Sequence, residues 1–324
     1  MDIQNIFDCT PSKFGPLALD IFRFQYRENT TYRTFCKHLG IAPGQVDTAE
    51  RIPFLPIQFY KTHKVYTGEF SPEIIFSSSG TTGQVPSKHF VADKSIYHKS
   101  FFRSFQQFYG SPGDYCILAL LPSYLEREGS SLVYMVNALI DKSAHPESGF
   151  YLHEHKLLAE KLHRLDSKGT RVLLIGVSFA LLDLVEKYSF RLKNTLVMET
   201  GGMKGRRKEM IREELHKKLR DGFGVPTIHS EYGMTELLSQ AYSTDDGKFE
   251  CPPWMKVLIR DPEDPLTILP PGKTGGVNII DLANLHSCSF LATQDLGKLL
   301  PDGGFEILGR FGHADLRGCN LMAL

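Results

Sequence analysis

The chain has 324 residues, with 37 Lys and Arg against 37 Asp and Glu, so its formal net charge is zero. This balance argues against a nucleic-acid-binding protein, which would carry a basic face. The 42% hydrophobic and 23% charged fractions are ordinary for a globular protein. The longest apolar stretch, residues 172–182, is far shorter than the ~20 residues of a membrane-spanning helix.

Cysteine usage and the N-terminus predict a compartment. The six cysteines include no C-x-x-C pair, and none lies near a second one at the spacing of a zinc site. Asp2 stands where a secretion signal would have basic residues. We therefore expect free thiols and a cytoplasmic location.

The first seventy residues have helical patterning. Leu17, Ile21, Phe24 and Phe35 recur at spacings that predict amphipathic helices. The prolines within residues 52–57 exclude a helix interior there, because proline lacks the backbone donor and clashes with the preceding turn.

From residue 71 onward, predicted strands alternate with predicted helices. The strands cover residues 73–77, 115–121, 171–175, 196–199 and 227–230, and the helices cover residues 94–108, 131–140, 179–188 and 208–220. This alternation predicts right-handed crossovers and a mostly parallel sheet, which is an α/β fold.

The pattern changes after residue 255, where Pro and Gly turns separate short apolar runs. These runs cover residues 257–259, 276–280, 290–293 and 305–308 and predict a smaller antiparallel or barrel-like β subdomain. We therefore expect four parts: a helical N-terminal segment over residues 1–70 packed on the main domain, an α/β core over 71–254, a β-rich subdomain over 255–310 and a tail over 311–324.

A loop rich in hydroxyl groups and glycine follows the predicted strand 73–77. Residues 77–83 read S-S-S-G-T-T-G, and Lys88 follows. Glycine lets backbone N–H groups turn toward an anion, hydroxyls add donors, and lysine supplies a charge that matches phosphate. No lysine follows the second glycine directly, so the common G-x-x-x-x-G-K-[ST] loop is absent. From these residues alone, the segment can be interpreted either as a phosphate-binding loop or as a flexible surface turn.

The loop is similar to the phosphate-binding signature of the adenylate-forming superfamily, which includes acyl-CoA synthetases and luciferase-type ligases. Five further motifs follow in the superfamily's order: E-T-G-G at 199–202, E-Y-G-M-T-E at 231–236, T-Q-D at 293–295, G-R at 309–310 and R-G-C-N at 317–320. Gln294 departs from the usual glycine of the third motif. Because the motifs keep their order over most of the chain, the chain is identified as a member of this superfamily.

The C-terminal end resembles one branch of the superfamily. The usual enzymes continue past the G-R hinge into a small lid domain, whereas fourteen residues follow Arg310 here, so we expect the lid domain to be absent. A short adenylating chain with a cysteine near its end resembles the LuxE-type acyl-protein synthetases, close to the phenylacetate-CoA ligases. The prolines within residues 52–57, followed by residues 61–63, K-T-H, also resemble that branch.

That resemblance implies a reaction. Its members use ATP and Mg²⁺ to activate a fatty or other carboxylic acid as an acyl-adenylate, and they transfer the acyl group to a cysteine thiol. A partner acyl reductase or acyl-carrier protein then receives it.

The resemblance also implies roles for individual residues. The β- and γ-phosphates would be held by Ser78, Ser79, Gly80, Thr81, Thr82, Gly83 and Lys88. Thr235 would donate to the α-phosphate and Glu236 would hold Mg²⁺. Tyr232 would stack on adenine beside Gly201 and Gly202. Asp295 would accept both ribose hydroxyls, and Arg310 would meet the same sugar-phosphate region. Cys319, five residues from the C-terminus, would accept the acyl group.

Other interpretations stay open at this point. One is a phenylacetate-type acyl-CoA or carrier-protein ligase that needs a lid supplied by another chain. Another is a non-catalytic nucleotide-binding subunit of a reductase complex, although the intact Lys88, Thr235 and Glu236 speak against it. Tyr232 could be a core aromatic residue and Cys319 a small buried apolar residue. The acyl group could also pass directly to a thiol of the partner.

Overall fold

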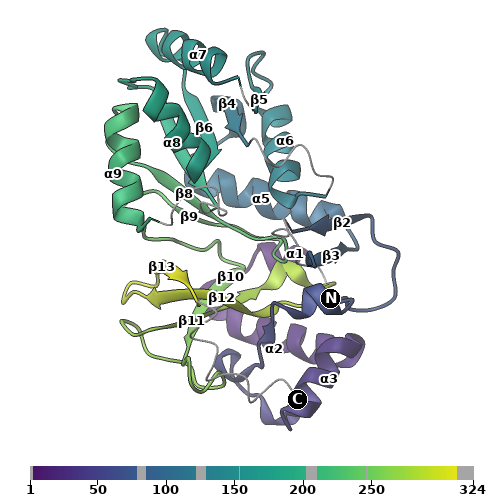
Figure 1. The fold of residues 1–324 in the computed structure, drawn as a ribbon. Helices are drawn as coiled ribbons and strands as arrows, with labels where there is room; N and C mark the ends of the chain where they lie inside the picture. Colours follow the sequence, from purple (N-terminus) through teal and green to yellow (C-terminus); the bar gives the residue numbers. More distant parts are fainter. Residues whose placement is uncertain are drawn as a thin grey trace. The chain divides into compact units, whose positions relative to one another are not determined.

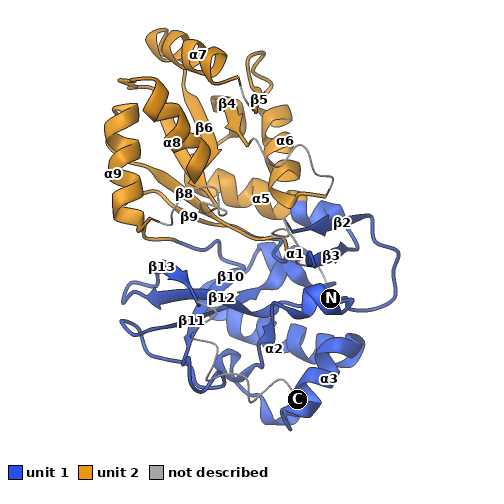
Figure 2. Cartoon of the chain, viewed as in Figure 1, with its two compact units in different colours: residues 1–97, 236–239, 250–324 blue, residues 98–235, 240–249 orange. Residues whose placement is uncertain are grey.

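The computed structural model describes residues 3–78, 85–121, 129–152, 154–201, 210–245 and 247–311. The chain divides into two compact units (Figure 2). Unit 1 comprises residues 1–97, 236–239 and 250–324, and unit 2 comprises residues 98–235 and 240–249. The four-part division expected from the sequence stays a prediction. Among the described residues, the helices are too short or too polar to cross a membrane.

Unit 2 is built on a six-stranded sheet with the order β5-β4-β6-β7-β8-β9. The strands are β4 (Cys116–Leu120), β5 (Gly149–Tyr151), β6 (Val172–Val177), β7 (Thr195–Thr200), β8 (His229–Tyr232) and β9 (Ala241–Ser243). Every pairing is parallel except that of β8 with the edge strand β9. Each residue of β4 and β6 is buried, as expected for strands covered on both faces. The predicted α/β fold with a mostly parallel sheet is confirmed.

Helices cover both faces of this sheet. They are α5 (Lys94–Tyr109), α6 (Ser131–Ser143), α7 (His155–Ser167), α8 (Ser178–Lys187) and α9 (Arg212–Phe223). Figure 1 shows α7, α8 and α9 on one side of the sheet and α5 and α6 on the other. Gly224 caps the C-terminal end of α9; its positive φ of 68° suits glycine, and a Cβ there would lie 2.8 Å from the carbonyl oxygen of Phe190.

Unit 1 contains a five-stranded, mainly antiparallel sheet. Its strands are β1 (Leu55–Pro56), β10 (Met255–Arg260), β11 (Thr274–Asp281), β12 (Phe290–Leu299) and β13 (Phe305–Arg310). The order is β1-β12-β11-β10, and β13 also pairs with β12. The pairs among β10 to β13 are antiparallel, and only β1 pairs in parallel, with β12. The smaller β-rich part predicted after residue 255 is therefore present.

The predicted N-terminal helices are also present in unit 1. They are α1 (Ile3–Phe7), α2 (Pro11–Glu28) and α3 (Thr30–His38), and the short α4 (Phe59–Thr62) follows β1. Helix α2 buries an apolar stripe that includes Phe14, Ile21 and Phe22. Its buried Gln25 donates to the carbonyl of Asn284 at 2.9 Å. Because Asn284 ends the 3₁₀ helix Leu282–Asn284, this bond ties the N-terminal helices to the segment after β11.

One predicted strand pairs differently from the expectation. Residues 73–77 were expected to open the parallel series, but β2 (Ile74–Ser77) forms an antiparallel pair with β3 (Lys88–Val91). The connection over residues 78–87 is too short for the helical crossover that a parallel pair requires. Ser78 and Ser87, which flank the glycine- and hydroxyl-rich loop, therefore belong to a hairpin in unit 1.

Candidate functional site

Two of the sequence motifs lie at the ends of adjacent strands in unit 2. Strand β7 ends with Glu199 and Thr200, and β8 ends with Glu231 and Tyr232; the register pairs Thr200 with Glu231. Gly201 follows β7 with a positive φ of 63°. Ligands of parallel α/β sheets gather at the carboxyl ends of the strands. The parallel register thus brings the E-T-G and E-Y-G motifs together at such an edge.

Tyr232 is held in place by an aromatic neighbour. Its side chain is 9% exposed, and its ring meets that of Phe249 edge to face, with centroids 5.8 Å apart. The next residue, Gly233, has no space for a side chain, because a Cβ there would lie 2.4 Å from Oε1 of Glu231. The glycine of the Y-G-x-T-E motif therefore makes room for the Glu231 carboxyl group.

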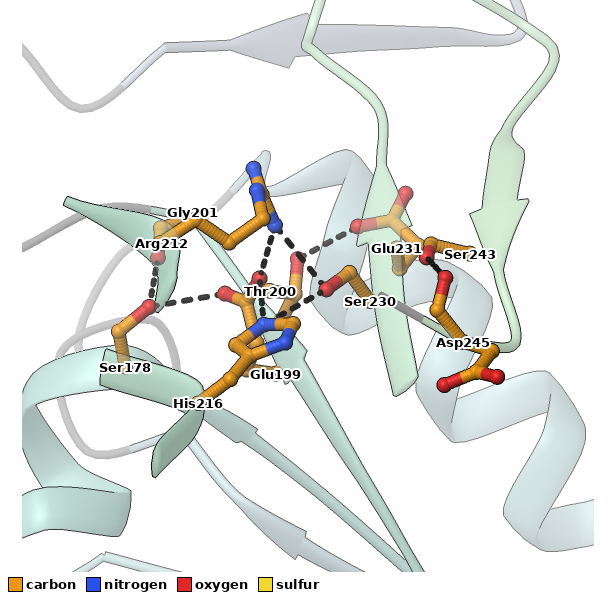
Figure 3. A network of polar contacts seen from close by, with 10 residues as sticks. All are labelled: Ser178, Glu199, Thr200, Gly201, Arg212, His216, Ser230, Glu231, Ser243 and Asp245. Atoms are coloured by element: carbon orange, nitrogen blue, oxygen red, sulfur yellow. Dashed lines mark hydrogen bonds and ion pairs between the residues drawn. The ribbon is translucent and has the colours of Figure 1, made fainter. Parts of the chain in front are cut away.

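Beneath these strand ends lies a buried network of polar side chains (Figure 3). Oε1 of Glu199 accepts from Nη1 of Arg212 at 2.8 Å, and Oε2 accepts from Oγ of Ser178 at 2.9 Å. Ser178 also lies 2.6 Å from the carbonyl oxygen of Gly201 and donates to it. Burial by itself would raise the pKa of Glu199, but the hydrogen bond from His216 and the charge of Arg212 outweigh it and lower that pKa. Ser178 thereby connects the carbonyl of Gly201 to the buried, charged Glu199.

Glu231 is the second carboxylate of this network. Oγ1 of Thr200 donates to Oε2 of Glu231 at 2.5 Å. Burial raises the pKa of Glu231 to about 7; the hydrogen bond from Thr200 opposes this shift, and the charge of Glu199 adds to it. Sequence reasoning missed Glu231, Arg212 and Ser178 as members of the site. The one available signal was the position of Glu231 immediately before Tyr232.

In unit 1, the β2–β3 hairpin contains Lys88 and Ser78, the described residues of the phosphate-binding candidates. The backbone N–H of Ser87 donates to Oγ of Ser78 at 2.8 Å, and the N–H of Ser78 donates to the carbonyl of Ser87 at 3.1 Å. Lys88 opens β3, pairs with Ser77 across the hairpin and is exposed. The hairpin base is therefore closed just below the loop. Five predicted loop residues lie outside the described residues: Ser79, Gly80, Thr81, Thr82 and Gly83.

Glu236, the last residue of the E-Y-G-M-T-E motif, is buried in unit 1 at 6% exposure. Its carbonyl accepts from Nδ2 of Asn284 at 2.8 Å. Burial raises the pKa of Glu236, and a hydrogen bond from Ser87 and the positive charges of Lys61 and Arg310 oppose that shift. The carboxylate therefore lies in an electropositive, largely water-excluded position. Thr235, which precedes it, is half-buried in unit 2.

A second buried acid holds the chain just after Glu236. Oδ2 of Asp281 accepts from the backbone N–H groups of Leu238 and Ser239 at 2.8 and 3.0 Å, and Oδ1 accepts from Oγ of Ser239 at 2.6 Å. Oγ of Ser239 also accepts from Nε1 of Trp254 at 3.0 Å. Burial raises the pKa of Asp281 to about 6, although these hydrogen bonds act to lower it. Asp281 was not among the predicted residues, because only the folded chain brings it to residues 238–239.

Asp295 and Arg310 meet directly in unit 1. They are register partners on β12 and β13, and Nε of Arg310 lies 3.0 Å from Oδ1 of Asp295. The Asp295 side chain is 7% exposed and that of Arg310 is 81% exposed, so a buried carboxylate lies beside a cation that reaches into solvent. Gly309, at φ +150°, adopts a conformation that favours glycine immediately before Arg310.

Some predicted residues are not placed. Gly202 and Cys319 lie outside the described residues. Within the part of the chain that the structure describes, no group of three or more His, Cys, Asp or Glu side chains is arranged to hold a metal ion.

Comparison with known proteins identifies the family of the chain. The LuxE acyl-protein synthetase family matches residues 12–323. The long-chain-fatty-acid–luciferin-component ligase of Vibrio harveyi is 24% identical over 331 residues, which cover 94% of this chain and 85% of that protein.

Solved structures of ligases share the fold. An open conformation of 2-hydroxyisobutyryl-CoA ligase, in complex with 2-HIB-AMP and CoA, superposes with a TM-score of 0.67 at 14% identity, covering 94% of this chain and 75% of that one. ATP-bound MatB from Rhodopseudomonas palustris superposes with a TM-score of 0.56 at 18% identity, covering 75% of this chain and 49% of that one. The chain therefore belongs to the LuxE family of acyl-protein synthetases, which are ATP-dependent ligases with the adenylate-forming fold.

Proposed function

We propose that this protein activates a long-chain fatty acid with ATP and then carries the acyl group as a thioester on its own cysteine. In the first step the carboxylate oxygen attacks the α-phosphorus, the bond to the bridging oxygen breaks, and pyrophosphate leaves. In the second step a thiolate attacks the carbonyl carbon, a C–S bond forms, and AMP leaves. The fatty acid is proposed because the Vibrio harveyi relative is named for a long-chain fatty acid.

The observation that carries nucleotide binding is the register of β7 and β8. It pairs Thr200 with Glu231 and so sets the Gly201 turn beside Tyr232 at the carboxyl edge of the parallel sheet. An aromatic ring next to an exposed glycine backbone suits a flat base, since the ring can stack on it and the glycine permits close approach. We assign adenine to Tyr232, Gly201 and Gly202.

The charged groups of unit 1 suit the sugar and phosphates. The buried carboxylate of Asp295 can accept hydrogen bonds from both ribose hydroxyls, and Arg310 supplies a cation beside it. Lys88 and the loop 78–83 are assigned to the β- and γ-phosphates, and the hydroxyl of Thr235 to the α-phosphate. Adenylation brings two anions together, so positioning and positive charge provide most of the rate enhancement.

Magnesium fits the residues that are present. Mg²⁺ in nucleotide sites is held by one or two carboxylates and the substrate's phosphates rather than by a cage of protein ligands. Glu236 offers one buried carboxylate, and a bound cation would offset the burial that raises its pKa. When bound, the ion would neutralise charge on the phosphates and on the pyrophosphate that leaves. Glu236 is therefore assigned as its protein ligand.

Cys319 is the proposed acyl acceptor. It lies nine residues beyond Arg310, in the C-terminal tail, and it carries the one thiol of that tail. A thiol accepts an acyl group from an adenylate and can still release it to another nucleophile, which suits delivery to a partner acyl reductase. The five other cysteines are free thiols, and four of them are buried.

The cysteines also support a reducing, cytoplasmic location. Cys36 and Cys288 are both fully buried, and the proximity of Cys36 adds to the burial that raises the pKa of Cys288. Both are free thiols. Free thiols are typical of proteins that work in a reducing compartment.

The proposal is tested with ATP, Mg²⁺ and a panel of labelled carboxylic acids. Pyrophosphate release and hydroxylamine-labile label on the protein are measured for the wild type and for Cys319→Ser. We expect release with long-chain acids, label on Cys319 in the wild type, and adenylate without label in the variant. Label transferred to added CoA would indicate an acyl-CoA ligase instead, and ATP binding without pyrophosphate release would indicate a non-catalytic subunit.

A further inference from the structure

Arg260, the last residue of β10, lies half-buried against the backbone of two other strands of unit 1. Its Nη1 donates to the carbonyl of Val277 at 2.8 Å and to Oδ1 of Asn278 at 2.9 Å, and its Nη2 donates to the carbonyl of Thr293 at 2.6 Å. Hydrogen bonds from a charged donor are stronger than neutral ones. One side chain thereby crosses β11 and connects β10 with β12.

The neighbouring strand is built to accommodate this guanidinium group. Gly276 is the register partner of Arg260 on β11, and a Cβ there would lie 2.4 Å from Cζ of Arg260. The register of β11 with β12 shifts between Gly276 and Asn278: Val277 alone faces three residues of β12, 293–295, so the extra residues of this bulge lie on β12. A bulge releases backbone groups from the regular ladder. The carbonyl of Val277 accordingly accepts from the Arg260 side chain and from Oγ1 of Thr293, at 3.0 Å.

The contacts of Arg260 reach both partners of the Asp295–Arg310 pair. Oγ1 of Thr293 accepts from the backbone N–H of Asp295 at 3.1 Å. On the other side, Phe311 follows Arg310, and its ring centroid lies 5.6 Å from Cζ of Arg260. The N–H of Phe311 donates to the carbonyl of the residue before Asp295 at 2.9 Å. Arg260 thus contacts Thr293, which binds the backbone N–H of Asp295. It also contacts the ring of Phe311, the residue after Arg310.

We propose that Arg260 is a positioning residue for ribose recognition. By holding Thr293 and Phe311, it keeps the Asp295 carboxylate and Arg310 in one arrangement, in which the carboxylate can accept hydrogen bonds from both ribose hydroxyls. Sites of this kind need their groups within about half an ångström of the productive geometry, which requires support from residues that do not touch the ligand. The inference rests on the proposed role of Asp295 with ATP.

The test compares equilibrium binding of ATP and of 2′,3′-dideoxy-ATP by calorimetry. In the wild type, loss of the ribose hydroxyls should weaken binding roughly 10- to 100-fold, because hydrogen bonds to a carboxylate are lost. In Arg260→Met this penalty should shrink to about 3-fold or less, because Asp295 no longer holds its position. Arg260→Lys should behave like Arg260→Met, since a single ammonium group cannot span the carbonyls of Val277 and Thr293. A variant that is only destabilised would bind both nucleotides more weakly and would keep the full difference between ATP and 2′,3′-dideoxy-ATP.

Two further variants make the outcome decisive. Gly276→Ala leaves Arg260 unchanged but displaces its guanidinium group, so it should also reduce the penalty. Lys256→Met on the same strand removes an exposed cation that pairs with Glu50, and it should keep the wild-type penalty. Circular dichroism and Trp254 emission identify the variants that remain folded. If the wild type shows no penalty, the ribose role of Asp295 is wrong. If the wild type shows it and the folded Arg260 and Gly276 variants retain it, the inference about Arg260 is overturned.

Discussion

Glu231→Gln should make the protein more stable at neutral and alkaline pH. The wild-type carboxyl group is 7% exposed, accepts a hydrogen bond from Thr200 and lies near the charge of Glu199. Burial raises its pKa from the ordinary 4.5 to about 7. Glutamine has nearly the same shape, keeps an oxygen that can accept from Thr200, and cannot ionise. The substitution therefore removes the cost of burying a charge and leaves the packing in place.

The sign and size of the effect follow from proton linkage. Between pH 4.5 and 7 the folded state retains a proton that the unfolded state has released, so the free energy of unfolding falls as pH rises through this range. Each pKa unit corresponds to about 1.4 kcal/mol, so the full cost above pH 7 is about 3 kcal/mol. The stability advantage of the variant over the wild type should therefore grow by roughly 2–3 kcal/mol between pH 5 and pH 8.

The assay is urea denaturation followed by far-UV circular dichroism at pH 5, 6, 7 and 8. Glu160→Gln is the matched control, because the Glu160 side chain on α7 is 64% exposed and its charge remains hydrated. The stability difference of the control should stay constant over the same range. A Glu231→Gln difference that does not change with pH would refute the argument that burial keeps this carboxyl group neutral.

Three further substitutions test the candidate site. Lys88→Ala should weaken binding of ATP about 10-fold or more and that of AMP much less, because the lysine is assigned to the terminal phosphates; equal losses by calorimetry would contradict that role. Asp281→Asn should reduce the free energy of unfolding by about 2–4 kcal/mol, because an amide NH₂ replaces an acceptor for buried donors. The emission of Trp254, the single tryptophan, reports this change through its bond to Ser239, and unchanged emission and midpoint would count against it. Gly233→Ala should abolish most ATP binding by displacing the Glu231 carboxyl group, and a double variant with Glu231→Ala should recover part of it; a double variant as impaired as the single one would exclude this steric cause.

Features that depend on contiguous residues could be predicted from the sequence. Apolar periodicity predicted the alternation of helices and strands that gives the parallel sheet of unit 2, and the Pro- and Gly-separated strands of unit 1. The motifs around Lys88, Tyr232 and Asp295 could be recognised in the same way, because each motif lies within one short segment. The resemblance to LuxE-type acyl-protein synthetases rested on the order of those motifs, and the family match confirmed it.

The contacts between residues far apart in the sequence could be seen only in the folded chain. The meeting of Thr200 with Glu231 depends on the register between β7 and β8. The contacts of Arg260 depend on a glycine of β11 and on a bulge of β12. The raised pKa of Glu231 arises from burial by segments far apart in the chain. Local patterns carry no information on register, bulges or burial by distant segments, because these are set by how the whole chain packs.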